Sequence, residues 1–195
     1  FTSGGTESNN LLINGFYQQN RDNRIAVSAI EHMSLLEPAQ NLGDVVDIIQ
    51  ADENGHINRS ALEQVVDERT SLISVMTANN ETGVIQDLAP LLDFAAENNC
   101  FFHTDATQAA GKVTLDFVES GIHAMTLSAH KLYGPVGVGA LIVDKRLPIK
   151  KLQFGGSQEK NLRAGTENVP AIVGFEKPAD LAITEMRSNA GHVHD

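Results

Sequence analysis

Residues 100–108 read Cys-Phe-Phe-His-Thr-Asp-Ala-Thr-Gln, an apolar run that ends at an acidic residue. A short run of this kind, bounded by small and polar residues, is typical of a strand buried in a sheet. We therefore predict a strand over 100–105, with Asp105 at its carboxyl end. In open α/β sheets, ligands bind at the carboxyl ends of the strands.

The rest of the chain alternates between strand and helix patterns. Further strands are predicted over 24–28, 70–78, 125–128 and 138–143, with a weaker candidate over 45–50. Helical spacing occurs over 60–66, over 87–98 after an N-cap signal at Asp87, and beyond Pro170, where Pro178 should kink or divide the helix. This alternation predicts an α/β fold with three layers, α/β/α, and a mainly parallel sheet. No internal boundary is evident, so residues 1–195 are predicted to form one domain.

Composition narrows the function classes. The net charge of −11, without a Lys/Arg cluster, argues against a nucleic-acid partner. No apolar run approaches the roughly 20 residues needed to span a bilayer, so no membrane association is expected. A single cysteine, Cys100, excludes an internal disulfide framework and fits a cytoplasmic protein. No metal site is predicted, because neither His-x-x-x-His nor Cys-x-x-Cys spacing occurs.

A lysine follows the predicted strand 125–128, in Ser128-Ala129-His130-Lys131, and the glycine-rich residues 134–139 come next. A lysine at a strand end, among small residues that admit a planar ligand, is suited to Schiff-base chemistry. Taken alone, Lys131 is more simply explained as a surface lysine, because exposed lysines are common.

Asp105 would emerge from a hydrophobic strand, and a buried carboxylate requires a partner. A protonated pyridine nitrogen is one such partner, since the ion pair keeps a cofactor ring cationic. A helix-cap role, with Thr107 and Gln108 following at once, explains the same residue without a ligand.

Near the start, residues 2–10 read Thr-Ser-Gly-Gly-Thr-Glu-Ser-Asn-Asn, the pattern of a strand-to-helix turn. Backbone N–H groups at a helix N-terminus favour a phosphate, and the Thr6 hydroxyl adds a donor. A Gly-Gly turn with Thr6 as N-cap accounts for these residues equally well.

Five blocks then occur in order along the chain: residues 4–10, 78–83, 103–108, 128–131 and 163–168. Together they resemble the cysteine desulfurases of the class V aminotransferase superfamily, which are fold-type I enzymes that use pyridoxal 5'-phosphate (PLP). The resemblance extends from Phe1 to about Ala190.

The resemblance implies a role for each matching residue. Lys131 would carry PLP as a Schiff base, Asp105 would face the pyridine nitrogen, and His32 would stack on the ring and help to move protons. Without the resemblance, His32 is more simply a bystander and His103 a strand residue. The remaining implied contacts are Gln108 and Asn80 at the phenolic oxygen, Gly5, Thr6, Ser128 and His130 at the phosphate, and Thr166 at the phosphate of a neighbouring subunit. A homodimer with a shared active site is therefore expected.

The implied reaction converts L-cysteine to L-alanine and passes sulfur to an enzyme cysteine as a persulfide, then to an acceptor protein. Cys100 is not expected to be that nucleophile, because it begins an apolar strand at the end opposite Asp105 and burial raises a thiol pKa. By the resemblance, the nucleophile and the arginine that binds the substrate carboxylate belong to a smaller domain beyond this chain. Residues 1–195 are thus expected to be a large domain, incomplete at both ends and inactive alone.

Two alternatives remain open. One is a different class V enzyme, such as a selenocysteine lyase or an aminotransferase. The other is a catalytically silent, dimerising scaffold for a sulfur-carrier or iron–sulfur cluster assembly partner, against which the presence of Lys131 argues.

Overall fold

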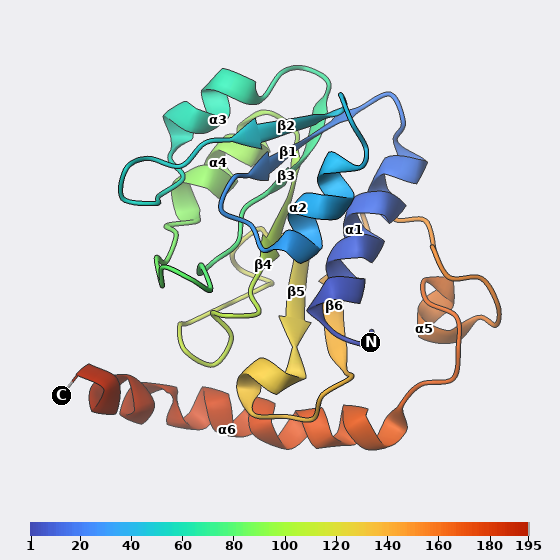
Figure 1. The fold of residues 1–195 in the computed structure, drawn as a ribbon, viewed down its shortest axis with the longest axis vertical. Helices are drawn as coiled ribbons and strands as arrows, with labels where there is room; N and C mark the ends of the chain where they lie inside the picture. Colours follow the sequence, from blue (N-terminus) through green and yellow to red (C-terminus); the bar gives the residue numbers. More distant parts are fainter. Residues whose placement is uncertain (195) are drawn as a thin grey trace.

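The computed structural model of the chain describes the backbone of residues 1–194 and the side chains of residues 1–186 and 188. Within these residues, six strands form one sheet in the order β2-β1-β3-β4-β5-β6 (Figure 1). Strands β1 to β5 run parallel, and β6 is antiparallel to β5. The predicted α/β fold with a mainly parallel sheet is confirmed. The strands are β1 (Arg24–Ser28), β2 (Val46–Ile49), β3 (Thr70–Ser74), β4 (Phe101–Asp105), β5 (Ala124–Ser128) and β6 (Gly139–Val143).

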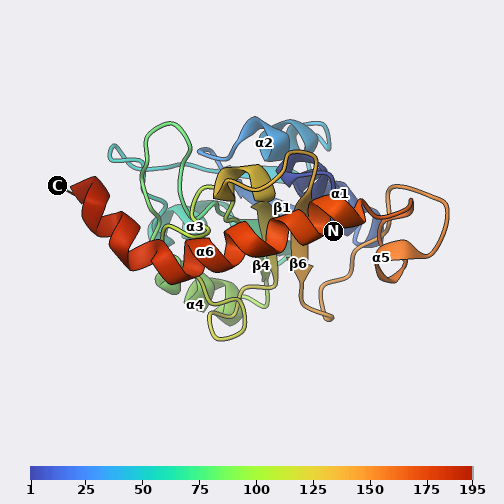
Figure 2. The same ribbon diagram turned by 90° about the horizontal axis from the view of Figure 1, so that it is seen from below.

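Helices cover both faces of the sheet, as Figures 1 and 2 show from two directions. On one face lie α1 (Gly5–Gln19) and α2 (Met33–Gln40), and on the other lie α3 (Arg59–Val65) and α4 (Ala89–Glu97). Successive strand residues point to opposite faces. Ile25 and Val27 therefore pack with α1 and α2, whereas Ala26 packs with α3 and α4. Two separate apolar cores therefore pack against the two faces of the central strands.

The C-terminal segment forms α6 (Val169–His194), which crosses the edge of the molecule beneath the short 3₁₀ helix η1 (Ala129–Leu132) (Figure 2). Besides the two cores, a third apolar cluster lies between η1 and α6, and Phe175 and Leu132 are buried in it. A four-residue helix, α5 (Gln158–Asn161), precedes α6. Pro178 was predicted to kink or divide this helix; α6 continues through Pro178 undivided, and Figure 2 shows the helix bending along its length.

Part of the α6 pattern does not face the core. Val173 and Ile183, two apolar residues of this helix, are 61% and 70% exposed. The apolar face of α6 is therefore only partly covered by the rest of the chain.

The predicted element boundaries fall within two residues of the observed ones except at the end of β3. The ladder of β3 ends at Ser74 rather than at residue 78, although the Val75 and Thr77 amides still bond to the carbonyls of β4. The N-cap of α4 is Leu88; Asp87 instead accepts a bond from the Ala89 amide. Helix α2 was not predicted, since Pro38 lies inside its eight residues.

The start of α1 is fixed against β6 by close backbone contact. Thr2 and Gly139 exchange two backbone hydrogen bonds of 2.9 Å. A Cβ on Gly139 would lie 2.6 Å from the Cα of Gly4, so only glycine permits this approach. The contact sets the N-terminus of α1 beside the carboxyl end of β5.

We predict that Phe102→Ala lowers the free energy of unfolding by about 3–5 kcal/mol, because this fully buried ring lies in the core beneath β4 and its removal leaves a cavity. Phe154→Ala, at a ring that is 75% exposed, is the matched control and should change stability by under about 1 kcal/mol. Urea denaturation of both variants measures the difference. Equal effects would show that β4 is not held by this core.

Candidate active site

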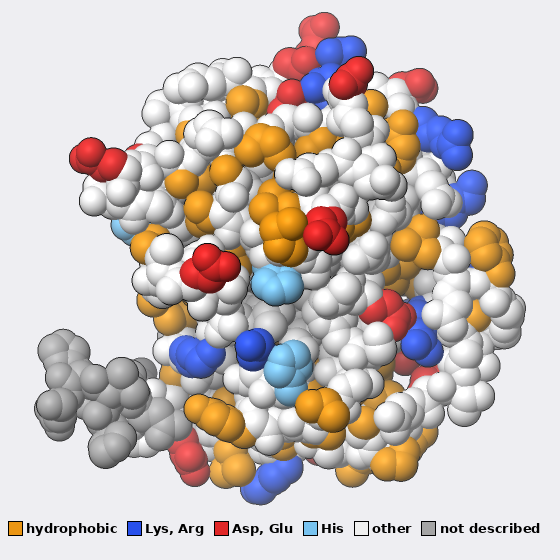
Figure 3. All heavy atoms as spheres, in the orientation of Figure 1, with side chains coloured by type: hydrophobic (Ala, Val, Ile, Leu, Met, Phe, Trp, Pro, Cys, Tyr) orange, Lys and Arg blue, Asp and Glu red, His pale blue; other side chains and the backbone are white. Residues whose placement is uncertain are grey.

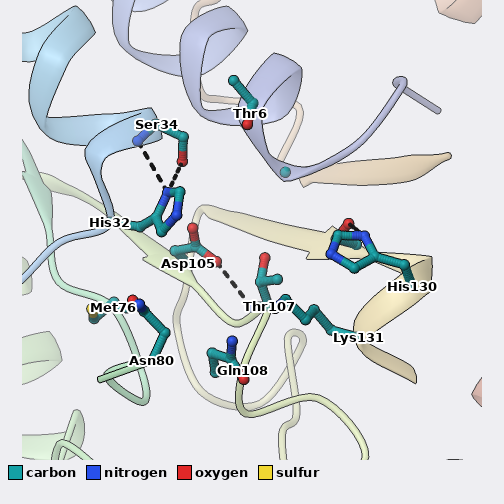
Figure 4. A pocket seen from close by; sticks show the side chains of 12 residues that line it. Thr6, His32, Ser34, Met76, Asn80, Asp105, Thr107, Gln108, His130 and Lys131 are labelled. Carbon is teal, nitrogen blue, oxygen red and sulfur yellow. Dashed lines mark hydrogen bonds between the residues drawn. The ribbon is translucent and has the colours of Figure 1, made fainter. Parts of the chain in front are cut away.

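A cavity of about 280 Å³ lies at the carboxyl ends of the parallel strands, and Figure 3 shows it as a hollow with histidine and lysine side chains at its rim. Nine of the ten predicted site residues line it, and they come from α1, β4, β5, η1 and the loops between these elements. The full lining is Gly5, Thr6, His32, Ser34, Met76, Asn80, Asp105, Thr107, Gln108, Ser128, His130 and Lys131 (Figure 4). Sequence reasoning did not single out Ser34, Met76 and Thr107.

Asp105 ends β4 at the floor of this cavity and is only 4% exposed. Its Oδ1 accepts a 2.9 Å bond from the Thr107 amide, and its Oδ2 accepts a 2.8 Å bond from the side-chain amide of Asn9. The first contact is the local capping role that the sequence left open. A carboxylate can accept about four hydrogen bonds, so capacity remains for a cation in the cavity.

Lys131 lies in η1, directly after β5, with its side chain exposed at the cavity wall. The neighbouring Ser128 is buried, and its Oγ lies 2.9 Å from Nδ1 of His130. Lys131 is thus a surface lysine in its exposure but faces the same cavity as Asp105 (Figure 4).

The N-terminus of α1 forms the opposite wall, and its features fit a phosphate. Gly4 is the N-cap and Thr6 lies in the first turn, so the prediction of Thr6 as a possible N-cap is wrong. A Cβ on Gly5 would lie 3.3 Å from Thr107 Oγ1. Any side chain larger than that of glycine at residue 5 would therefore crowd the space beside this helix end. Thr107 Oγ1 is buried and has no hydrogen-bond partner among the described residues. An anion at the free amides of the helix would give that hydroxyl an acceptor.

Neighbouring residues orient Gln108 and shape the loop that carries Asn80. The Lys112 ammonium donates to the backbone and side-chain oxygens of Gln108, at 2.9 and 3.3 Å, which leaves the Gln108 amide nitrogen free to donate. Burial, and then the nearby Lys131, lowers the pKa of Lys112. Asn79 accepts from the Glu81 and Thr82 amides and so shapes the loop that presents Asn80.

A buried polar layer lies beneath the cavity. His103 is fully buried; its two ring nitrogens lie 2.8 Å from Ser74 Oγ and 3.1 Å from Thr126 Oγ1. Burial lowers the pKa of His103 to about 4, so the ring is neutral at pH 7. His103 is therefore a strand residue whose ring forms hydrogen bonds with hydroxyl groups on β3 and β5.

Glu31, next to His32, is the second member of this layer. Its Oε1 accepts a 2.7 Å bond from Ser28 Oγ and a 2.5 Å bond from the Met76 amide, while its buried Oε2 has no partner among the described residues. Burial raises the pKa of Glu31 to about 8, and the nearby charge of Asp105 adds to the effect. One of two neighbouring carboxyl groups is therefore protonated at pH 7.

Thr166 does not line the cavity. It lies in a separate hollow with Ser3 and Arg163 at the outer side of the α1 N-terminus. Arg163 Nε donates to Glu7 Oε1 at 2.8 Å, so the last sequence block is tied to the first. Although burial opposes it, bonds from Arg163 and Ser3 hold the pKa of Glu7 below its usual range. The contact of Thr166 with a neighbouring subunit remains a prediction.

Cys100 lies just before β4, away from the cavity, and is buried. Burial raises the pKa of its thiol to about 11, so the thiolate is scarce at pH 7. The expectation that Cys100 is a core residue is confirmed.

The sequence pattern of the family described as "Aminotransferase class-V" matches residues 1–195. The chain belongs to the aminotransferase class-V family. Among curated relatives, the cysteine desulfurase IscS of Dictyoglomus turgidum is 44% identical over 95% of this chain and 48% of its own length. The mitochondrial cysteine desulfurase of Eremothecium gossypii is 39% identical over 99% of this chain and 41% of its own.

Solved structures of similar proteins share the fold of this class-V chain. A NifS-like protein superposes with a TM-score of 0.93 at 36% identity, covering 98% of this chain and 54% of its own. DndA from Streptomyces lividans gives a TM-score of 0.88 at 37% identity, covering 96% and 56%. The chain spans about half the length of the curated relatives it matches.

Metal sites and membrane-spanning helices are both absent from the described part of this class-V chain. No group of three or more His, Cys, Asp or Glu side chains there is placed to hold a metal ion. No helix there is both long and apolar enough to cross a bilayer.

We predict that Glu31→Gln flattens the dependence of stability on pH. Between the ordinary carboxyl pKa of 4.5 and about 8, the folded chain keeps a proton that the unfolded chain has lost, so the free energy of unfolding falls as pH rises. The variant lacks this titration. Its stability relative to the parent should therefore rise by a few kcal/mol across the window, since one pKa unit is worth about 1.4 kcal/mol.

Urea denaturation at intervals from pH 4.5 to 8.5 measures this difference. Glu53→Gln, at an exposed position, is the control and should follow the parent at every pH. A parallel course for Glu31→Gln and the parent would contradict a protonated Glu31.

Proposed function

We propose that the chain is the PLP-binding part of a cysteine desulfurase, an enzyme that removes sulfur from L-cysteine and leaves L-alanine. The single observation that carries the proposal is the meeting of Asp105, Lys131 and the α1 N-terminus around one cavity. Curated relatives named as cysteine desulfurases, at 39–44% identity over nearly the whole chain, support the choice of reaction.

The cavity offers a matching group for each part of PLP. The Asp105 carboxylate would hold the protonated pyridine nitrogen, and the Lys131 amine would bind the aldehyde carbon. Gln108 and Asn80 would donate to the phenolic oxygen, and His32 would cover the ring. The phosphate would lie at the α1 N-terminus, held by Gly5, Thr6, Ser128 and His130, with the unpartnered Thr107 hydroxyl beside it.

When bound, PLP would supply an electron-withdrawing ring that stabilises negative charge at the α-carbon of a substrate held through its amino group. The residues of the chain would maintain the electron-withdrawing state of that ring. The buried Asp105 would hold the pyridine nitrogen protonated. Because Glu31 is protonated, it would place no second negative charge beside that of Asp105. Lys131 Nζ and His32 are the groups placed to move the substrate α-proton.

The sulfur would pass to a cysteine thiolate and then to an acceptor protein. Cys100 does not suit this step, because its thiol is buried and lies at the other end of β4. The accepting thiol would therefore come from another segment of a longer protein or from another chain. A cytoplasmic homodimer, in which Thr166 reaches the partner's phosphate site, completes the proposal.

We predict that the chain binds PLP with a visible absorption band and that borohydride then fixes the label on Lys131. Lys131→Ala should lose both band and label, because Lys131 is the one lysine among the cavity-lining residues. Lys145→Ala, at an exposed position after β6, is the control and should match the parent. Absorption titration and peptide mapping measure the two effects.

Two outcomes would count against this proposal. A parent chain that binds no PLP would favour the silent scaffold, and a label elsewhere than Lys131 would refute the role of that residue. Addition of L-cysteine to the loaded chain should change the spectrum, and a response to other small amino acids instead would favour a different class V enzyme.

A further inference from the structure

We propose that Asn9 and Ser34 are positioning residues: together they hold His32 with its proton on Nε2 and connect its ring to Asp105. The contacts form one chain. Asp105 Oδ2 accepts from Asn9 Nδ2 at 2.8 Å, Ser34 Oγ accepts from the same nitrogen at 2.9 Å, and Ser34 Oγ lies 2.8 Å from His32 Nδ1. The tautomer follows from these contacts alone; its meaning for catalysis rests on the proposed function.

The orientation of the Asn9 amide is fixed by Asp105. The side chain is fully buried, and both hydrogens of Nδ2 have acceptors, one on Asp105 and one on Ser34. The reversed orientation would place the amide oxygen against a carboxylate oxygen, where both are acceptors. The observed orientation leaves Asn9 Oδ1 buried with no partner among the described residues. The protein tolerates that unfavourable group to keep the amide donor on Asp105.

The fixed amide in turn orients the Ser34 hydroxyl. Because Ser34 Oγ accepts from Asn9, its own hydrogen is free to point at His32 Nδ1. The Ser34 backbone N–H also points at Nδ1, at 3.1 Å, as the capping bond of α2. A backbone amide can only donate, so Nδ1 must carry a lone pair. In the neutral ring, the proton is then on Nε2.

Figure 4 shows the consequence for the cavity, with the imidazole between Ser34 and Asp105 and both Ser34 bonds on the same ring nitrogen. The ring therefore offers an N–H donor at Nε2, on the side away from Ser34. The Asn9 amide group donates to Asp105 at the cavity floor and also to Ser34, which in turn contacts His32 at the cavity wall. A change at either end is transmitted through Asn9 to the other.

Nitrogen NMR of the cofactor-free chain, labelled with ¹⁵N-histidine and recorded at a pH where His32 is neutral, tests the assignment. The expected result is a single tautomer, with an unprotonated Nδ1 resonance and a protonated Nε2 resonance. A proton on Nδ1, or both forms in similar amounts, would overturn the proposal. This result comes from the parent chain, so it stands even where a variant does not fold.

Variants test the connection itself. Ser34→Ala keeps the backbone donor but loses the hydroxyl, and the Nδ1-protonated form should appear; Ser34→Thr, which restores a hydroxyl, should reverse the change. Asp105→Ala should move the His32 nitrogen resonances although no hydrogen bond joins the two side chains, whereas Ser128→Ala, at the other wall, should not. Unchanged His32 resonances in Ser34→Ala and Asp105→Ala would refute the connection.

No PLP is present in these measurements, so their outcome is independent of the proposed function. A chain with the expected tautomer that binds no PLP would refute the proposed function and leave the role of Asn9 and Ser34 intact.

Discussion

The burial of one carboxylate, Asp105, at the end of the central strand β4 is the constraint on which the candidate site depends. A charged group that is 4% exposed requires hydrogen-bond donors, and the protein supplies them from its own turn and from α1. Each donor also serves the cavity: Thr107 brings its hydroxyl beside the α1 N-terminus, and Asn9 also bonds Ser34. The acid thus organises the groups around it as well as the ligand it would bind.

The second buried carboxyl group shows how the same constraint is managed below the cavity. Two ionised acids so close together and shielded from water would repel each other strongly, and Glu31 avoids this by retaining its proton. His103, neutral because of its burial, adds no compensating charge. Asp105 is left as the acid with spare acceptor capacity facing the cavity, an arrangement that favours a cationic ring atom as its partner.

Much of this could be predicted from the sequence, because the strongest signals are local. The apolar run 100–105 ends at an acid in the sequence as it does in β4, and the block around Lys131 follows a strand in both. The missed residues act over long separations: Asn9 and Asp105 are 96 positions apart, and no periodicity reveals their contact. Helix α2 was missed because Pro38 obscures its pattern, and with it the capping role of His32.

Ring-nitrogen NMR of the chain loaded with PLP that carries ¹⁵N in its pyridine ring tests the central claim most directly. If Asp105 is the partner of the cofactor, the parent should show a protonated ring nitrogen, and Asp105→Ala should show a neutral one with weaker binding. A neutral ring nitrogen in the parent, or a protonated one that survives Asp105→Ala, would contradict the account.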